Sequence, residues 1–144
     1  MDAHALADEL STLLAHESCS LARHVEEATP YLTPRTFKLW RHVREVLDLD
    51  RGHAARLTAL LDRLGLPQRT RPFDTDVATF HFARMEYVLE HLLAEKRRQV
   101  ESYDRAIALA AGDAATRSEL EALAADSRRQ VEELEQALRQ TKAA

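Results

Sequence analysis

Six polar residues stand at positions of this 144-residue chain where the surrounding pattern predicts apolar side chains. In four long segments, apolar residues recur three and four positions apart, the spacing that places side chains on one face of a helix. A polar residue interrupts each apolar series near its middle, so we expect it to point into the protein. The six residues are Glu17, Asp50, His53, Glu95, Ser127 and Gln130.

The three carboxylates of this set create an electrostatic conflict. Moving a bare carboxylate out of water is costly unless it is paired or coordinated, and three inward carboxylates also repel one another. A divalent cation removes the conflict, and carboxylates together with an imidazole suit iron, manganese or zinc. No Lys or Arg occupies a position of the apolar series, and the run Lys96-Arg97-Arg98 is expected on a solvated face. The lack of an inward cation is the one argument for a bound metal.

A metal-free interior is the alternative. A buried carboxylate–histidine hydrogen bond, either Asp50–His53 or Glu17–His53, needs no metal. Ser127 and Gln130 can then satisfy the remaining lone pairs, and protonation of one carboxylate removes the excess charge. The residues by themselves leave both interpretations open.

The elements that position these residues follow from the places where Gly and Pro occur. The chain has only 3 Gly and 4 Pro, well below the ordinary usage of about 7% and 5%, so long helices with few turns are expected. Breaks are predicted around residues 30–34, 65–72 and 112, with Gly65 ending one helix and Asp113 capping the next. The result is an all-α four-helix bundle that forms a single domain over residues 1–144. The helices are expected at about 3–28, 34–64, 80–111 and 113–141.

The connection between the second and third helices decides the topology. At about 3.3 Å per residue, the roughly 15 residues after Gly65 span about 45–50 Å. A helix of about 25–30 residues is about 40 Å long, so residues 66–80 can cross the whole bundle. Phe73, Val77 and Phe80 would hold this crossover against its side. Alternatively, residues 75–80 extend the third helix, which gives a plain up-down bundle.

Two stretches resemble the ferritin-like superfamily, nearest its bacterioferritin and rubrerythrin branch. Residues 50–67, DRGHAARLTALLDRLGLP, are similar to that family's second-helix stretch, where Glu-x-x-His precedes leucine repeats and a closing Leu-Gly-x-Pro. Residues 125–135, ADSRRQVEELE, are similar to its fourth-helix stretch, and Glu17 and Glu95 fall at its first-helix and third-helix ligand positions. The resemblance covers nearly the whole chain. It implies a crossover bundle built around a dimetal centre, with Glu from two helices and Glu-x-x-His from the other two.

The chain departs from that pattern at three positions. Asp50 is one methylene shorter than the family's Glu, and Ser127 and Gln130 replace the Glu and His of the fourth helix. Dimetal oxidation and ferroxidase activity need two metals about 3.5–4 Å apart, so we expect neither activity and no catalytic residues. Haem is not expected, because residues 51 and 52 lack the Met that haem-binding members use. The degenerate centre holds either no metal or a single iron, manganese or zinc ion, whose ligands by resemblance are Glu17, Asp50, His53 and Glu95.

Two classes of function follow. One is a metalloprotein that retains a single ion, and the other is a non-catalytic bundle that acts as a homodimeric binding or adaptor protein. A net charge of −4 gives no general attraction to nucleic acid, the apolar runs are too short for a membrane span, and the single Cys19 fits a reducing cytoplasm.

Gly52, between Asp50 and His53, is expected either to give the backbone slack or to admit another helix, from this chain or a second subunit.

Overall fold

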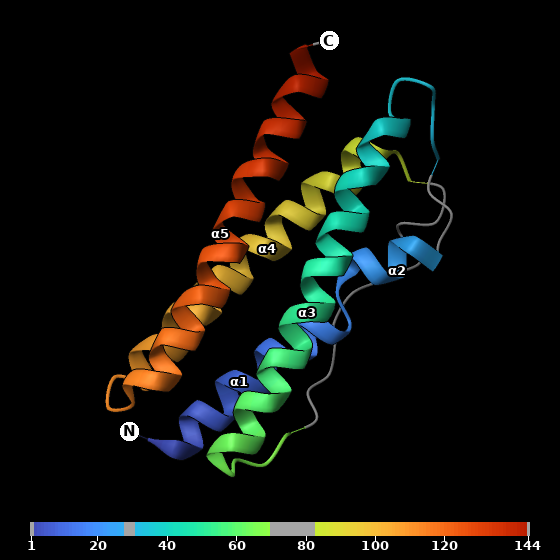
Figure 1. Cartoon of the computed structure of the whole chain (residues 1–144). Helices are drawn as coiled ribbons and strands as arrows, with labels where there is room; N and C mark the ends of the chain where they lie inside the picture. The colour runs from blue at the N-terminus through green and yellow to red at the C-terminus, as the bar shows by residue number, and fades with distance from the viewer. Residues whose placement is uncertain (1, 28–30, 70–82, 144) are drawn as a thin grey trace.

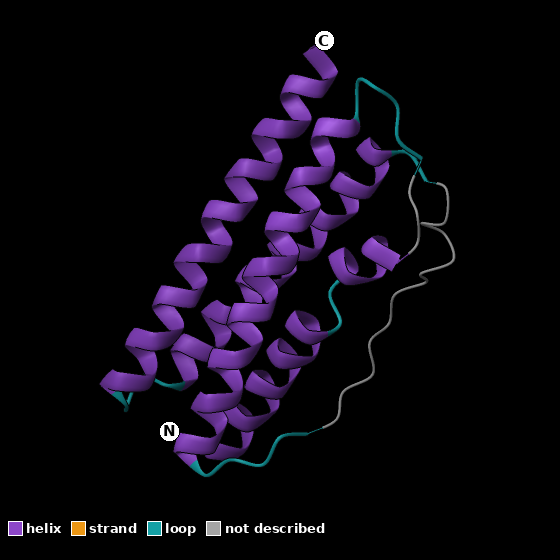
Figure 2. Cartoon of the chain, turned by 45° about the vertical axis from the view of Figure 1, so that its right-hand side comes forward, coloured by secondary structure: helices purple, strands orange, loops and turns teal. Residues whose placement is uncertain are grey.

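The computed structural model describes residues 2–27, 31–69 and 83–143, and its long elements are all helices (Figure 1). Four of them lie side by side as a bundle, which Figure 2 shows along its length. The predicted all-α class is confirmed. The elements are α1 (Ala3–Ser18), α2 (Leu21–Glu27), the short 3-10 turn η1 (Phe37–Leu39), α3 (Trp40–Leu64), α4 (Met85–Leu109) and α5 (Ala114–Ala143).

The first predicted helix is wrong as one continuous element, because it is divided into α1 and α2. No Gly or Pro marks the division. Its cause is a contact from another helix, since the Leu21 N–H at the start of α2 donates to both oxygens of Glu95, at 3.3 and 3.1 Å. A carboxylate at this place accepts a hydrogen bond from an amide that the helix itself leaves unpaired. Its negative charge also interacts favourably with the positive end of the helix dipole. The chain therefore turns at Cys19 and Ser20, between the two helices.

The other helix boundaries lie closer to prediction. α3 begins at Trp40 rather than near residue 34, because Thr33 and Thr36 hydrogen-bond each other in a turn before it. Gly65 ends α3 with φ 63°, as predicted for a C-terminal cap. Asp113 caps α5 as predicted, and its Oδ1 accepts from the amides of Ala115 and Thr116 at 3.1 and 3.2 Å.

The direction of α4 confirms the long crossover. α3 and α4 run the same way in Figure 1, whereas α1 and α5 run the opposite way, so the chain between α3 and α4 must return along the bundle. The plain up-down alternative is therefore wrong. The start of the crossover lies against α1, where the Arg69 amide donates to Ser11 Oγ at 3.0 Å. Phe73, Val77 and Phe80 fall in residues 70–82, outside the described residues, and their predicted role stays a prediction.

The core consists of two apolar clusters with a polar layer between them. One cluster gathers residues such as Val43, Leu92 and Leu134 near the start of α3, and the other gathers residues such as Leu10 and Leu57 near its end. All six polar residues singled out in the sequence are buried, with exposed fractions of 6% or less. We call them the polar layer: Glu17, Asp50, His53, Glu95, Ser127 and Gln130. In the described ranges, none of the helices is long and apolar enough to cross a membrane.

Gly52 lies on the exposed side of α3. A Cβ added there would meet no described atom of this chain within 4 Å. Close approach by another helix of the same chain is therefore wrong for the described residues, while approach by a second subunit stays a prediction.

The two α3 glycines should respond in opposite directions to replacement by alanine. Gly52→Ala should raise the free energy of unfolding by about 1 kcal/mol, because alanine favours a helix interior. Gly65→Ala should lower it by about 1 kcal/mol, because alanine is disfavoured at positive φ. Urea unfolding of both variants measures the difference. A loss of stability in Gly52→Ala, together with dissociation seen by light scattering, would instead place a second subunit against this helix.

Candidate functional site

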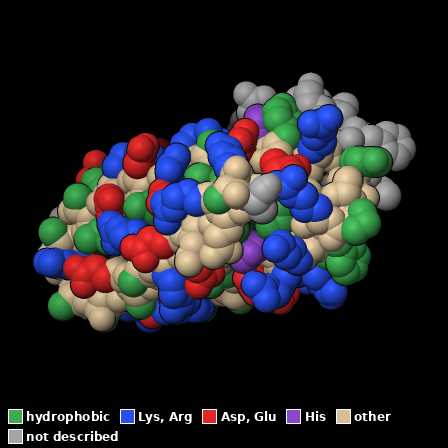
Figure 3. Space-filling model, turned by 90° about the horizontal axis from the view of Figure 1, so that it is seen from above, with side chains coloured by type: hydrophobic (Ala, Val, Ile, Leu, Met, Phe, Trp, Pro, Cys, Tyr) green, Lys and Arg blue, Asp and Glu red, His purple; other side chains and the backbone are tan. Residues whose placement is uncertain are grey.

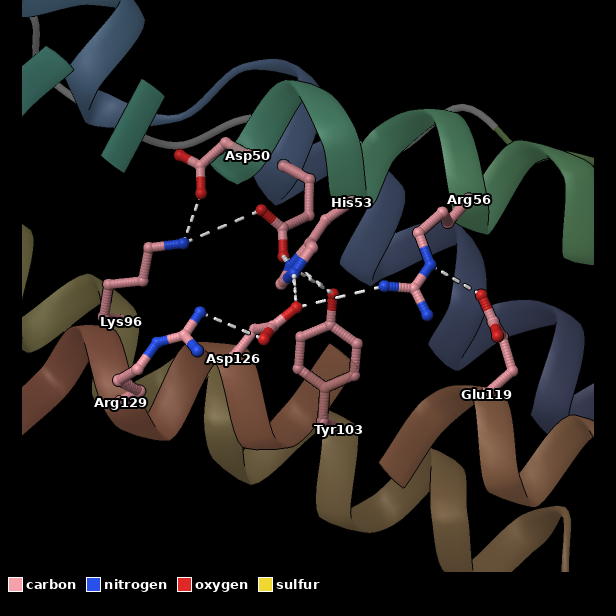
Figure 4. Close-up of polar contacts among 9 residues, drawn as sticks. Asp50, His53, Arg56, Lys96, Tyr103, Glu119, Asp126 and Arg129 are labelled. Atoms are coloured by element: carbon pink, nitrogen blue, oxygen red, sulfur yellow. Dashed lines mark hydrogen bonds and ion pairs between the residues drawn. The ribbon is translucent and has the colours of Figure 1, made fainter. Parts of the chain in front are cut away.

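The polar layer is organised around Lys96, a residue predicted to face solvent. Lys96 is only 1% exposed. Its side chain extends from α4 toward α3, where Nζ donates to Asp50 Oδ1 and lies 3.7 Å from Glu17 Oε2 (Figure 4). The prediction that no cation reaches the interior is therefore wrong. The physical reason lies in one buried helix face with steps of four, three and four residues, formed by Leu92, Lys96, Gln99 and Tyr103.

Glu17 and His53 meet on the other side of this ion cluster. Glu17 Oε1 accepts a hydrogen bond from Tyr103 Oη at 2.7 Å and lies 3.1 Å from His53 Nδ1. The Tyr103 and His53 rings meet edge to face with their centroids 6.0 Å apart. Of the two carboxylate–histidine bonds considered from sequence, the structure contains Glu17–His53.

His53 connects the buried cluster to the surface. Its Nε2 lies 3.4 Å from Asp126 Oδ2, and the Asp126 side chain is 31% exposed. Two arginines flank that carboxylate, with Arg129 Nη2 at 3.1 Å from Oδ1 and Arg56 Nη1 at 3.9 Å from Oδ2. Figure 4 shows this polar path between α3 and α5. Asp126 was not identified from sequence, although its place beside Ser127 was a usable signal.

Burial and neighbouring charge give the two central carboxyl groups different pKa values. Burial raises the pKa of Asp50 well above its usual range and, with the nearby Glu17 carboxylate, outweighs the opposing effect of Lys96. Burial would also raise the pKa of Glu17, but the nearby Lys96 ammonium and the polar contacts with His53 and Asp50 lower it to about 2. Asp50 is therefore the protonated partner and Glu17 the anion. Asp50 and Glu17 raise the pKa of Lys96 against the opposite effect of burial, so Lys96 is the cation that faces them.

The remaining members of the polar layer face elsewhere. Both Glu95 oxygens accept from the Leu21 amide, and burial raises the pKa of Glu95 to about 7. Gln130 Nε2 lies 3.4 Å from Glu133 Oε2, and Ser127 Oγ has no hydrogen-bond partner among the described residues. The metal-free interpretation assigned Ser127 and Gln130 to the buried carboxylates, but neither residue makes those contacts.

As they lie, these side chains do not fit a pair of metal ions. Lys96 already interacts with Asp50 and Glu17, the Glu95 oxygens face an amide, and the two α5 positions carry neutral side chains. Within residues 2–27, 31–69 and 83–143, no group of three or more His, Cys, Asp or Glu side chains is arranged to hold a metal. A single ion held by Glu17, Asp50, His53 and Glu95 stays a prediction, and it requires Lys96 and Glu95 to leave their present partners.

Replacing Lys96 tests whether its charge holds the polar layer together. Lys96→Met should lower the free energy of unfolding at neutral pH by about 3–5 kcal/mol, because it leaves buried carboxyl groups without their cation. The double variant Lys96→Met with Asp50→Asn should recover part of that loss, since it also removes one acid. Urea unfolding of the two single variants and the double variant gives the coupling. Strictly additive effects would contradict a direct Lys96–Asp50 interaction.

Glu95 should make stability depend on pH. Its raised pKa means that the protonated form stabilises the fold fully below about pH 4.5, and that this contribution is lost as the pH rises to about 7. The difference corresponds to about 3 kcal/mol at most. Glu95→Gln keeps an acceptor for the Leu21 amide and cannot ionise, so it should be more stable than the wild type at pH 8 and similar at pH 4.5. Unfolding curves of the variant and the wild type at each pH measure this effect. The same difference in unfolding free energy at pH 4.5 and at pH 8 would contradict the prediction.

Comparison with known proteins agrees with the fold. A family model described as a ferritin-like domain matches residues 6–144, which include all four bundle helices and the crossover between α3 and α4. No curated protein and no solved structure matches the chain significantly. Because the matched region covers nearly the whole sequence, the chain belongs to the ferritin-like family.

Proposed function

We propose that this ferritin-like protein lacks a complete dimetal centre and acts as a non-catalytic binding bundle. The observation that carries the proposal is the position of Lys96, whose Nζ donates to Asp50 and lies 3.7 Å from Glu17. The ammonium provides, from within the chain, the positive charge that these buried carboxyl groups would otherwise take from a metal.

The donor chemistry supports the same conclusion. A protonated Asp50 is a poor metal ligand, and Ser127 and Gln130 offer no anionic or imidazole donor on α5. His53 uses one ring nitrogen toward Glu17 and the other toward Asp126. A second metal therefore has no terminal ligands, and dimetal oxidation has no site.

The surface offers a place for a partner. A groove of about 710 Å³ runs between α3 and α5, and side chains such as Arg41, Glu45, Asp48, Arg129 and Glu133 line it. Both signs of charge alternate there and over the face shown in Figure 3. Mixed charge suits a protein surface better than the uniform negative charge of nucleic acid. We propose a second copy of this chain as the partner, in a cytoplasmic homodimer.

Retention of one metal is the second candidate. Asp50 Oδ2 and Glu17 Oε2 accept no hydrogen bond from a protein N–H or O–H in the described part of the chain. If Lys96 moved away, these two oxygens and His53 would form the core of a site for one iron, manganese or zinc ion. The displacement of an ion-paired lysine makes this candidate the less favoured one.

Metal content separates the two candidates. Protein purified without chelator and incubated with iron, manganese or zinc should retain less than about 0.1 metal ion per chain after desalting, because no deprotonated ligand set is free. Elemental analysis measures this, with His53→Ala as the control. Stoichiometric metal that disappears in His53→Ala would establish the single-metal candidate and overturn our proposal, and two ions per chain would overturn both.

A further inference from the structure

We propose that Lys96 and Asp50 condense into an isopeptide bond between Lys96 Nζ and Asp50 Cγ, with the Glu17 carboxylate as the proton carrier. The product is a covalent link across the interior of the bundle. The proposal goes beyond the absence of a metal centre, although both start from the same contact.

The two reacting groups are in contact and buried in the protein interior. Asp50 is 0% exposed and Lys96 is 1% exposed, and the Nζ atom already donates to the Asp50 carboxyl group. Apolar clusters lie on both sides of the polar layer. Fixed placement of a nucleophile against its target replaces a bimolecular encounter and greatly raises the effective concentration of the amine.

The protonation states can be reached without any outside reagent. Condensation needs a protonated Asp50 carboxyl group and a neutral amine. One proton passed from the Lys96 ammonium to the Glu17 carboxylate, 3.7 Å from Nζ, gives the neutral amine without changing the net charge of the cluster. An apolar surrounding favours this neutral pair over the ion pair relative to water.

Glu17 is placed to carry the protons of the reaction. As the Nζ lone pair forms the C–N bond, the protonated Glu17 carboxyl group gives its proton to the departing Asp50 hydroxyl group, which leaves as water. The Glu17 carboxylate then takes the excess proton from the new amide nitrogen and ends protonated. The products are one amide and one water molecule, and no oxidant or cofactor is consumed. Tyr103 and His53, at 2.7 and 3.1 Å from Glu17 Oε1, hold the Glu17 carboxyl group in place during both proton transfers.

The bond would join α3 to α4, which run in parallel and are connected by the long crossover. Residues 50 and 96 are 46 positions apart, so the bond closes a large loop that contains the crossover. Such a closure restricts the unfolded chain. It would also consume Asp50 as a metal ligand and Lys96 as a charge.

Intact mass spectrometry of the denatured wild-type protein is the direct test. Most molecules should be about 18 Da lighter than the sequence requires, which is the mass of one water molecule. Trypsin should not cleave after Lys96, and the peptides that carry Asp50 and Lys96 should be recovered as one branched species. The full sequence mass after prolonged incubation of folded protein at neutral pH would overturn the proposal and leave the metal-content result untouched.

Matched controls separate the cross-link from other water losses. Lys96→Arg keeps a cation in place and should show the full mass, with folding checked by circular dichroism. Glu17→Gln should lower the linked fraction at a given time, because the proton carrier is lost. The exposed pair Lys142–Glu90, 3.5 Å apart, should give separate peptides. A water loss that persists in Lys96→Arg would come from a cyclised aspartate and would overturn the proposal.

Discussion

The interior of this bundle depends on one cation, the Lys96 ammonium between Asp50 and Glu17. At the middle of a helical bundle the effective dielectric constant is low, so an unpaired carboxylate there is far more costly than at the surface. Lys96 removes that cost from within the chain. It also restricts the geometry, because its side chain must cross from α4 to a single place on α3. The relative heights of these two helices are therefore set by a polar contact, while the two apolar clusters above and below fill the remaining space.

Glu95 is adjacent to Lys96 in the sequence but contacts a different part of the bundle. Consecutive residues on a helix point about 100° apart, so Lys96 can face the centre of the layer while Glu95 faces α1 and α2. There its carboxylate accepts hydrogen bonds from the Leu21 amide. This contact interrupts what would otherwise be one helix from residue 3 to 27. The break lies at Cys19 and Ser20, less than one helical turn after Glu17, whose carboxylate lies at the centre of the layer. The position of the first carboxylate and the shape of the first helix thus have one common cause.

The sequence was sufficient for features that repeat or that have local causes. Helical spacing predicted the four bundle helices and the burial of six polar residues, and Gly65 and Asp113 predicted two helix ends. The division of α1 from α2 could not be predicted this way, because its cause lies 74 residues away in Glu95. Lys96 was missed for another reason. It stands in a basic run whose other members face solvent. From Leu92, a step of three residues leads to Glu95 and a step of four leads to Lys96, and only Glu95 was assigned to the interior.

The ionisable side chains of the layer balance much of their charge among themselves. Burial raises the pKa of Asp50 well above its usual range and that of Glu95 to about 7, whereas Glu17 stays ionised with a pKa of about 2. Near neutral pH the central cluster then contains one anion, Glu17, and one cation, Lys96. A complete dimetal centre needs more carboxylates, because it must balance two divalent ions. Ser127 in place of the family's Glu, the protonated Asp50 and the inward Lys96 all reduce the negative charge of the layer, so these three features act in the same electrostatic direction.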